Sequence, residues 1–359
     1  MENYIYQWNS QLFHLSEEQV AELKGGVQSG DALCCYRLGR YLACVRPEAD
    51  SVDMAAELFD RAAHGGVADA TAALALMWRS GDMGLVDRAK SKELMTEALE
   101  QGSELAAKEV LFDMIYGRNG CEPDIDKAKS ILDALMGQSD NPTWLYIMGC
   151  IVEEQTGDKS AAAEWFEHAA EAGVTDAYID LAFACAMDSS GSIVDYDRYI
   201  DILNRGVDAA NGQSLTLWVL ENVTLYEQWE DKAEFRENII TDLNCALNWG
   251  DSYAAYNLGN IYLEGSYDIP QDAQCAWEYF TKGAILGSDF CYEAMYDMLA
   301  DGIVEVSDSF KEMVALNGTR CGSRRLRTET VKIYKSGGLT AFAPEIEQYY
   351  LPLYEANIE

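Results

Sequence analysis

The chain has 359 residues, of which 49% are hydrophobic and 11% aromatic, and its 26 basic and 61 acidic residues give a net charge of −35. The apolar content argues against intrinsic disorder, and the negative field disfavours nucleic acid and anionic lipid surfaces while attracting cationic partners. The same charge would also arise if an acidic surface served only to keep an elongated protein soluble.

The ten cysteines show no CxxC spacing, and most lie in apolar helical runs, as Cys150 does. We expect them to be reduced and to behave as small buried hydrophobes. Residues 1–8 lack the basic and apolar regions of a signal peptide, and no uncharged apolar run approaches the roughly 18 residues of a membrane span. These features predict a cytoplasmic protein that is not bound to a membrane.

A helical cap is expected first, over residues 1–29, where apolar residues from Leu12 to Leu23 have helical spacing. A repeated unit follows, and two independent series mark it. Glycines recur at intervals of 35 to 39 residues, at Gly30, Gly66, Gly102, Gly137, Gly173, Gly212, Gly250 and Gly287. Apolar anchors keep the same register, at Leu38, Leu74, Val110, Met148, Leu181, Leu220, Leu258 and Met295. The two series predict a chain that grows by repetition instead of around one compact core.

Each unit is predicted to contain two helices, and the pattern is clearest over residues 251–287. Apolar residues at helical spacing predict a first helix that ends near Gly265. A second helix follows, and we expect Gly287 to end it in the left-handed conformation. Gly259 would let the two helices approach closely, while Leu258 and Phe280 would fill the space between them.

This pattern, A-x₃-L-G-x₂-Y-x₂-G followed by A-x₃-(Y/W)-(Y/F)-x₂-A-A-x₂-G, resembles the Sel1-like repeat of the tetratricopeptide superfamily. Residues 254–287 and 34–66 match it closely, whereas the fourth unit has Trp144 and Met148 in place of Ala and Leu, and other units lack the Gly of the first helix. The resemblance covers residues 30–302. It implies an all-α, right-handed α-solenoid of about eight helix-hairpin repeats, and scaffold or adaptor work. Cysteine pairs eight apart, which staple the secreted members, are absent.

The repeat is lost over residues 303–359, which we expect to form a C-terminal helical cap that Pro344 and Pro352 break into short helices. Within this cap, residues 319–335 carry six basic residues and one acidic residue, so the rest of the chain carries a charge of −40. This basic segment is expected to dock on an acidic repeat surface, in the same chain or in a partner subunit. A solvated face without a partner would have the same composition.

Motifs of catalysis or of metal binding are absent from the sequence, which has only three histidines. His64 and His168 precede hairpin-ending glycines, where a cation suits the C-terminus of a helix. Asp195 is better explained as a helix cap than as a calcium ligand with Asp197 and Asp201. We therefore expect no enzyme activity, no cofactor and no metal site.

The remaining candidate site is the face of each first helix that points away from its partner, two positions before and after the anchor. In tetratricopeptide-like folds this face lines a concave groove that receives peptides, and aromatic residues there would anchor a partner. Alternatively, these aromatic residues pack only between adjacent first helices. The predicted groove residues are Tyr36, Arg40, Tyr146, Trp218, Tyr256 and Asn260.

The sequence thus predicts a non-catalytic interaction scaffold whose concave, acidic and aromatic groove binds a basic peptide or protein. An alternative of another class is an acidic inhibitor or immunity-type protein that occupies a nucleic-acid-binding protein or a toxin.

Overall fold

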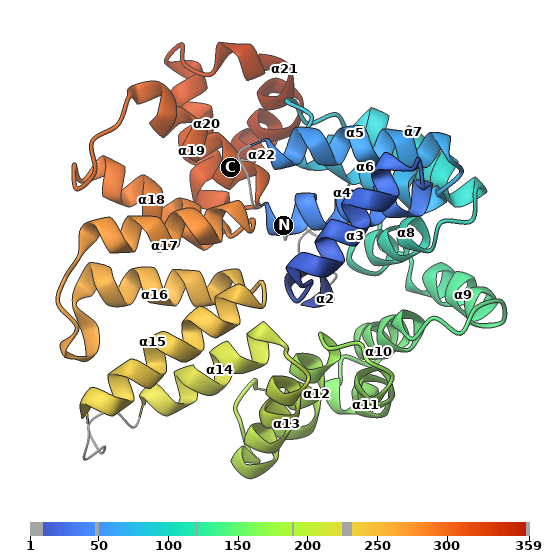
Figure 1. Cartoon of the computed structure of the whole chain (residues 1–359), viewed down its shortest axis with the longest axis horizontal. Helices are drawn as coiled ribbons and strands as arrows, with labels where there is room; N and C mark the ends of the chain where they lie inside the picture. The colour runs from blue at the N-terminus through green and yellow to red at the C-terminus, as the bar shows by residue number, and fades with distance from the viewer. Residues whose placement is uncertain (1–9, 47–49, 120, 189, 225–231, 357–359) are drawn as a thin grey trace. The chain divides into compact units, whose positions relative to one another are not determined.

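The computed structural model describes residues 10–46, 50–119, 121–188, 190–224 and 232–356 (Figure 1). Within these ranges the chain is helical, and its only extended pairing is an isolated bridge between Met187 and Ile193. The predicted all-α fold is confirmed. None of the described helices is long and apolar enough to cross a membrane. Residues 1–9, on which the expectation about a signal peptide rests, lie outside the described ranges.

First and second helices of the repeats alternate along the chain at the predicted positions. The first helices are α4 (Ala32–Val45), α6 (Ala68–Ser80), α8 (Glu104–Tyr116), α10 (Thr143–Thr156), α12 (Ala177–Ala186), α14 (Gly212–Val223), α16 (Ser252–Glu264) and α18 (Asp289–Ala300). The second helices are α5 (Ser51–His64), α7 (Arg88–Glu100), α9 (Ile125–Met136), α11 (Ala163–Glu171), α13 (Tyr196–Asp208), α15 (Lys232–Asn248), α17 (Ala273–Ile285) and α19 (Asp308–Arg320).

The helices belong to two compact units. Unit 1 combines both ends of the chain, Met1–Glu97 and Gln228–Glu359, and unit 2 is the middle, Ala98–Glu227. The sequence carries no linker or composition change at either boundary, so this division was not predicted.

The glycines between repeats end the second helices as expected. Gly66 and Gly287 have φ of 87° and 88°, in the left-handed region that glycine enters without steric cost. After Gly287, the Ser288 N–H donates to the Gly283 carbonyl oxygen at 3.0 Å. This is the bond that satisfies a free carbonyl at the C-terminus of a helix.

Two members of the glycine series differ from the others: Gly137 caps the end of α9 in another conformation, and the assignment of Gly212 to the end of a helix is wrong. Gly137 is right-handed, with φ of −76°. Gly212 is the first residue of α14, and Ala210, with φ of 57°, takes the left-handed position instead. The Asn211 N–H still donates to the Gly206 carbonyl oxygen at 2.9 Å, so the local bonding pattern survives without a glycine.

The repeat continues past residue 302, where the sequence suggested that it ends. Helix α19 packs against α18, and Gly322 follows it with φ of 113°. The Ser323 N–H then donates to the Gly318 carbonyl oxygen at 3.0 Å, and a further first helix begins as α20 (Arg324–Lys335). The expected cap boundary therefore falls inside the hairpin of α18 and α19.

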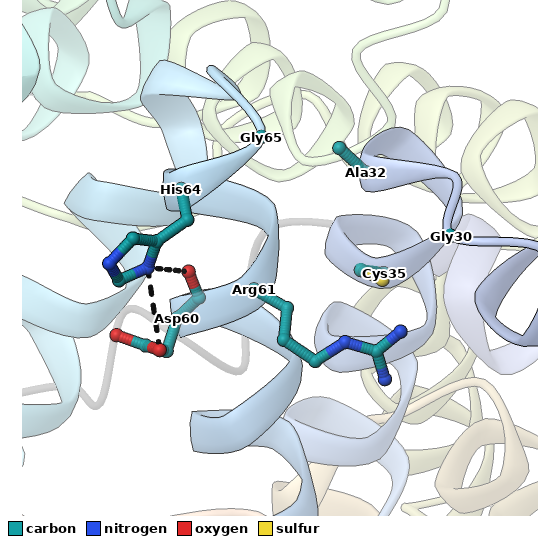
Figure 2. A pocket seen from close by; sticks show the side chains of 7 residues that line it. All are labelled: Gly30, Ala32, Cys35, Asp60, Arg61, His64 and Gly65. Carbon is teal, nitrogen blue, oxygen red and sulfur yellow. Dashed lines mark hydrogen bonds and ion pairs between the residues drawn. The ribbon is translucent and has the colours of Figure 1, made fainter.

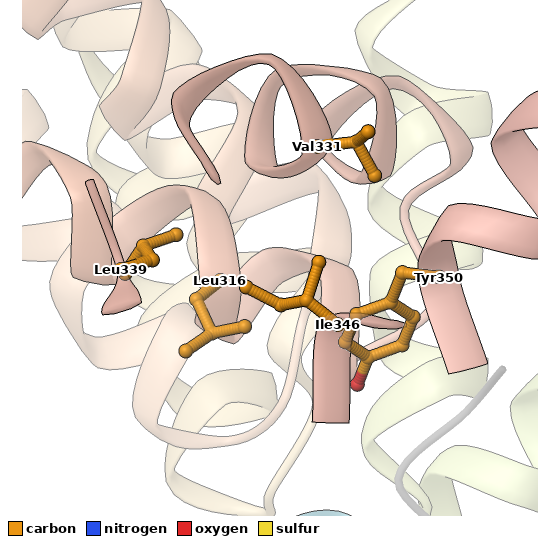
Figure 3. Close-up of a cluster of buried hydrophobic side chains, with 5 residues drawn as sticks. All are labelled: Leu316, Val331, Leu339, Ile346 and Tyr350. Atoms are coloured by element: carbon orange, nitrogen blue, oxygen red, sulfur yellow. The ribbon is translucent and has the colours of Figure 1, made fainter. Parts of the chain in front are cut away.

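The prolines do not break the rest of the C-terminal region as expected, because residues 343–356 are helical throughout, with Pro344 in the first turn and Pro352 just after a π-helical turn. A 3₁₀ turn, η4 (Thr340–Phe342), leads into α21 (Ala343–Glu345), a π-helical turn, η5 (Ile346–Tyr350), and α22 (Leu351–Ala356). These pieces share a small core with α19 and α20 (Figure 3). It is formed by Leu316, Val331, Leu339, Ile346 and Tyr350.

The N-terminal segment does more than cover the first repeat. Helix α2 (Ser10–Phe13) and helix α3 (Glu17–Gln28) both pack against α4 of the first repeat. In addition, the ring of His14 lies 5.8 Å from that of Trp249, and Phe13 occupies the space that a side chain at Gly250 would need. Residues from the two ends of the chain therefore touch within unit 1.

Candidate functional site

In α4, α8, α16, α18 and α20 the start of the helix is fixed by a polar cap directly after a glycine. Asp251 accepts a hydrogen bond from the Tyr253 N–H at 3.1 Å, and Ser288 accepts one from the Cys291 N–H at 3.2 Å. Such caps satisfy donors that the helix itself leaves unpaired. Because glycine and cap recur together, the same side-chain position faces outward in successive first helices.

Tyr36 and Arg40, two of the predicted groove residues, are engaged with each other on α4. The Arg40 guanidinium donates to the Tyr36 hydroxyl at 2.9 Å and lies 5.8 Å from the ring centroid, while the Tyr36 ring packs against Phe59. Burial raises the pKa of Tyr36, and Arg40 acts against that shift. Both side chains are half-buried, so they complete the first hairpin and leave little surface for a partner.

Tyr146 on α10 is also used inside the protein. Its hydroxyl donates to the Asp180 carboxylate on α12 at 2.7 Å. Its ring centroid lies 6.5 Å from Phe112 on α8 and 5.7 Å from Phe166. Burial, together with the neighbouring Asp180 carboxylate, raises the pKa of Tyr146 well above its usual value. At this position the geometry matches the alternative, in which the aromatic residue packs between adjacent first helices.

The other predicted residues are half-buried. Trp218 lies on α14, where its carbonyl oxygen accepts a hydrogen bond from the Asn222 amide at 2.8 Å. Tyr256 and Asn260 lie one turn apart on α16 and therefore share a face. The six predicted residues are divided between the units, with Tyr146 and Trp218 in unit 2 and the others in unit 1.

The half-buried ring of Tyr256 lies against two exposed rings that the sequence prediction missed. Its ring centroid lies 5.9 Å from Tyr253 and 5.6 Å from Phe290 on α18, and Tyr253 lies 6.3 Å from Phe290. Phe290 is 53% exposed and Tyr253 is 39% exposed. We call Tyr253, Tyr256 and Phe290 the aromatic cluster. Tyr253 and Phe290 each stand three residues after a hairpin-ending glycine, and that spacing is the signal that could have found them.

An acidic row lies on α18 beside the cluster. Asp289, Glu293 and Asp297 are spaced by four residues and so follow one face of the helix. Arg325 on α20, which also stands three residues after a glycine, pairs with Asp297 and approaches Glu293 at 3.8 Å. The basic segment thus contacts an acidic repeat surface of the same chain.

Unit 2 holds a further acidic pair, which the sequence did not single out. Asp176 directly precedes α12, and Asp180 lies one turn later on the same face. Burial raises the pKa of Asp176 to about 7; Lys108 acts against the shift and Asp180 adds to it. Lys108 on α8 is itself buried, only 4% exposed. The Asp176 carboxyl is therefore a group that exchanges a proton near neutral pH.

An open depression lies where α4 begins and α5 ends (Figure 2). It is lined by Gly30, Ala32, Cys35, Asp60, Arg61, His64 and Gly65. The His64 Nδ1 atom lies 2.8 Å from the Asp60 carbonyl oxygen and 3.4 Å from the Asp60 carboxylate. Arg61 donates to the Val27 carbonyl oxygen at 3.0 Å. His64 and Arg61 therefore contact backbone oxygens of the same chain near the end of a helix. Such a structural role is the one expected for His64.

Asp195 has the capping role expected from the sequence, accepting a hydrogen bond from the Arg198 N–H at 3.0 Å at the start of α13. His168 lies in the last turn of α11. The cysteines that the structure describes are free thiols.

The helix pairs, the glycine turns and the small residues under Phe59, Phe166 and Phe280 define one recurring unit, and comparison with known families identifies it. The Sel1 repeat family matches residues 32–67, 68–103, 150–174 and 252–288. This chain contains Sel1 repeats. Proteins with Sel1 repeats generally mediate protein–protein interaction and act as non-catalytic scaffolds.

Two solved structures resemble the chain. One is a protective antigen of uropathogenic Escherichia coli displaying an SLR fold, with 18% identity, 95% of this chain and 74% of that chain covered, and a TM-score of 0.43. The other is a Sel1 repeat protein from Oxalobacter formigenes, also with 18% identity and a TM-score of 0.43, covering 92% of this chain and 95% of that chain. No curated protein matches the sequence.

Proposed function

We propose that this Sel1-repeat protein is a non-catalytic scaffold that binds a basic peptide or protein segment through the exposed faces of its first helices. The observation that carries the proposal is the aromatic cluster. Phe290 and Tyr253 remain 53% and 39% exposed while they contact each other and Tyr256. Clustered aromatic side chains on a surface are the usual anchors of protein interfaces.

The charge of the chain supports a basic partner. A net charge of −35 attracts cationic segments over a distance. Aromatic faces also bind cations directly, and this chain uses that contact internally. The Lys282 ammonium lies 4.8 Å from the Tyr279 ring and the Arg118 guanidinium 4.5 Å from the Tyr116 ring. A segment that combines Arg or Lys with an apolar side chain fits both features.

The cluster replaces part of the groove predicted from the sequence. Tyr256 keeps its place, and Asn260 lies one turn away on the same face of α16. Tyr36, Arg40 and Tyr146 have hydrogen-bonding partners within the chain, so we assign them no direct contact with the ligand. Trp218 remains a separate candidate in unit 2.

The proposal can be tested by selecting peptides from a random display library on the full chain. We expect the selected peptides to be enriched in Arg and Lys, and Phe290→Ala to weaken their binding at least tenfold. Phe310→Ala is the matched control, because Phe310 is 45% exposed but lies on the second helix α19. Selection of acidic peptides, or equal effects of the two substitutions, would contradict the proposal.

A further inference from the structure

Within unit 1, the loop between α6 and α7 is bound to the C-terminal helices by a buried carboxylate. Glu345 is 1% exposed. It accepts hydrogen bonds from Arg320 at 2.8 and 2.9 Å, from the Tyr350 hydroxyl at 2.8 Å and from the Val86 backbone N–H at 3.2 Å. Arg320 also donates to the Gly84 carbonyl oxygen at 2.8 Å. One ion pair thus holds two segments that lie far apart in the sequence.

A second set of contacts extends this junction to the start of α7. The Arg88 backbone N–H donates to the Tyr349 hydroxyl at 3.1 Å, and the Arg88 guanidinium lies 4.6 Å from the Tyr349 ring centroid. Tyr350, the next residue, belongs to the small core that packs under α20 (Figure 3). The polar contacts therefore rest on a packed apolar base.

The junction continues toward the first repeat. Arg46, at the end of α4, pairs with Asp82 at 3.1 Å. Both side chains influence the buried thiol of Cys321. Burial raises the pKa of that thiol to about 12, with Asp82 adding to the shift and Arg46 opposing it. The end of α4, the loop after α6 and the end of α19 accordingly meet at one place.

A buried ion pair adds little net stability compared with apolar packing, but the loss of one partner leaves a buried charge uncompensated. Such a pair therefore favours one arrangement of the chain over near alternatives. Val86 and Glu345 are separated by 259 positions, and closing a loop of that length requires contacts that offset its entropy.

We infer that the loop between α6 and α7 and the C-terminal helices form a clasp, latched by Arg320 and Glu345, that couples the two ends of the chain. Without the latch, the N-terminal repeats separate from the C-terminal helices while each part keeps its own helices. The clasp makes unit 1 a single cooperative unit assembled from both ends. This inference is independent of the proposed function.

Hydrogen–deuterium exchange of the full chain, read by mass spectrometry, tests the clasp. Glu345→Gln keeps the shape of the side chain but leaves the Arg320 charge unpaired. We expect residues 81–88 to exchange at least tenfold faster in this variant, although the substitution lies in α21. Arg325→Gln is the control, because it removes an exposed ion pair of α20 and should leave residues 81–88 unchanged. Parent-like exchange at residues 81–88 in Glu345→Gln would overturn the inference.

A second pair of variants tests the clasp from the other side, and decides the matter if Glu345→Gln does not fold. Gly81 and Gly84 both have positive φ, 86° and 100°, so alanine strains the backbone at either position. A Cβ at Gly81 would lie 2.8 Å from the Arg320 guanidinium carbon, whereas at Gly84 nothing lies within 4 Å. Gly81→Ala should therefore speed exchange at residues 339–351 more than Gly84→Ala does. Equal exchange in the two variants would exclude the clasp.

Discussion

Gly259 on α16 and Phe280 on α17 are in direct contact, because a Cβ at Gly259 would lie 2.3 Å from the Cε1 atom of the Phe280 ring. The same relationship recurs between Gly149 and Phe166, at 2.5 Å. The ring fills the space that a side chain on the first helix would need. The glycine of the repeat is thus required by packing, since its backbone is helical.

We predict that Gly259→Ala lowers the free energy of unfolding by about 2 kcal/mol, because Phe280 is fully buried and overpacking forces it from its site. Urea unfolding followed by circular dichroism measures the change. Gly25→Ala is the matched control. Gly25 is also helical, but nothing lies within 4 Å of its missing side chain, so alanine there should stabilise by roughly 0.5–1 kcal/mol. If Gly25→Ala also destabilised the protein, contact with a buried ring would not explain why glycine is needed in these helices.

Tyr146→Phe should destabilise the protein by about 1–2 kcal/mol, because it removes the 2.7 Å hydrogen bond to the half-buried Asp180 carboxylate. Tyr256→Phe should change the free energy of unfolding by less than about 0.5 kcal/mol, since no hydrogen bond to the Tyr256 hydroxyl is seen in the described part of the chain. The comparison in denaturant isolates the hydroxyl, because both rings pack against a buried Phe of the second helix. Equal losses would mean that the bond to Asp180 adds no stability.

The stability of unit 2 should fall as the pH rises from about 4 to 7. The pKa of Asp176 is raised to about 7 in the folded chain, above its value of about 3.9 in an unfolded chain. The folded state therefore binds this proton more tightly, and its stabilising effect is complete at low pH and lost as pH passes 7. Lys108, which opposes the shift, and Asp180, which adds to it, are the charged groups that act on this carboxyl.

Asp176→Asn should remove this pH-dependent contribution to the free energy of unfolding. The urea midpoint of the variant should therefore change less between pH 5 and pH 8 than that of the parent. Asp188→Asn is the control, because hydrogen bonds from Ser190 and Ser192 lower the pKa of this exposed carboxyl. The Asp188→Asn variant should keep the pH-dependent contribution of Asp176 to stability. A parent-like pH dependence in Asp176→Asn would assign the effect to another group.

If the scaffold binds a basic peptide, attraction by charge and burial of the aromatic cluster should separate experimentally. Raising salt from about 0.05 to 0.5 M shortens the screening length from roughly 14 to 4 Å, so association of a selected peptide should slow. Tyr256→Ala should instead speed dissociation, weakening binding by about 1–3 kcal/mol if the ring is an anchor. Stopped-flow measurement at both salts resolves the two rates. Affinity that responds to salt alone would favour the acidic-inhibitor alternative.

In the candidate site, one position of the repeat has two different roles. Tyr146 and Tyr256 occupy the same position relative to their anchors, yet Tyr146 is bonded to Asp180 and Tyr256 joins two exposed rings. The position was predictable because the helical period fixes which residues share a face. The different roles were not, because they depend on which side chains the neighbouring first helices present.

The sequence by itself determined the alternating helices, the turns at Gly66 and Gly287, and the contact of Gly259 with Phe280. These features follow from interactions within about forty residues, and the same sequence pattern recurs several times along the chain. Only the tertiary structure decided that Ala210 replaces Gly212 at its turn, that Phe290 stays exposed, and that Glu345 binds Val86. A contact across 259 positions leaves no periodic mark in the sequence, because it is made once, by residues whose neighbours along the chain do not specify it.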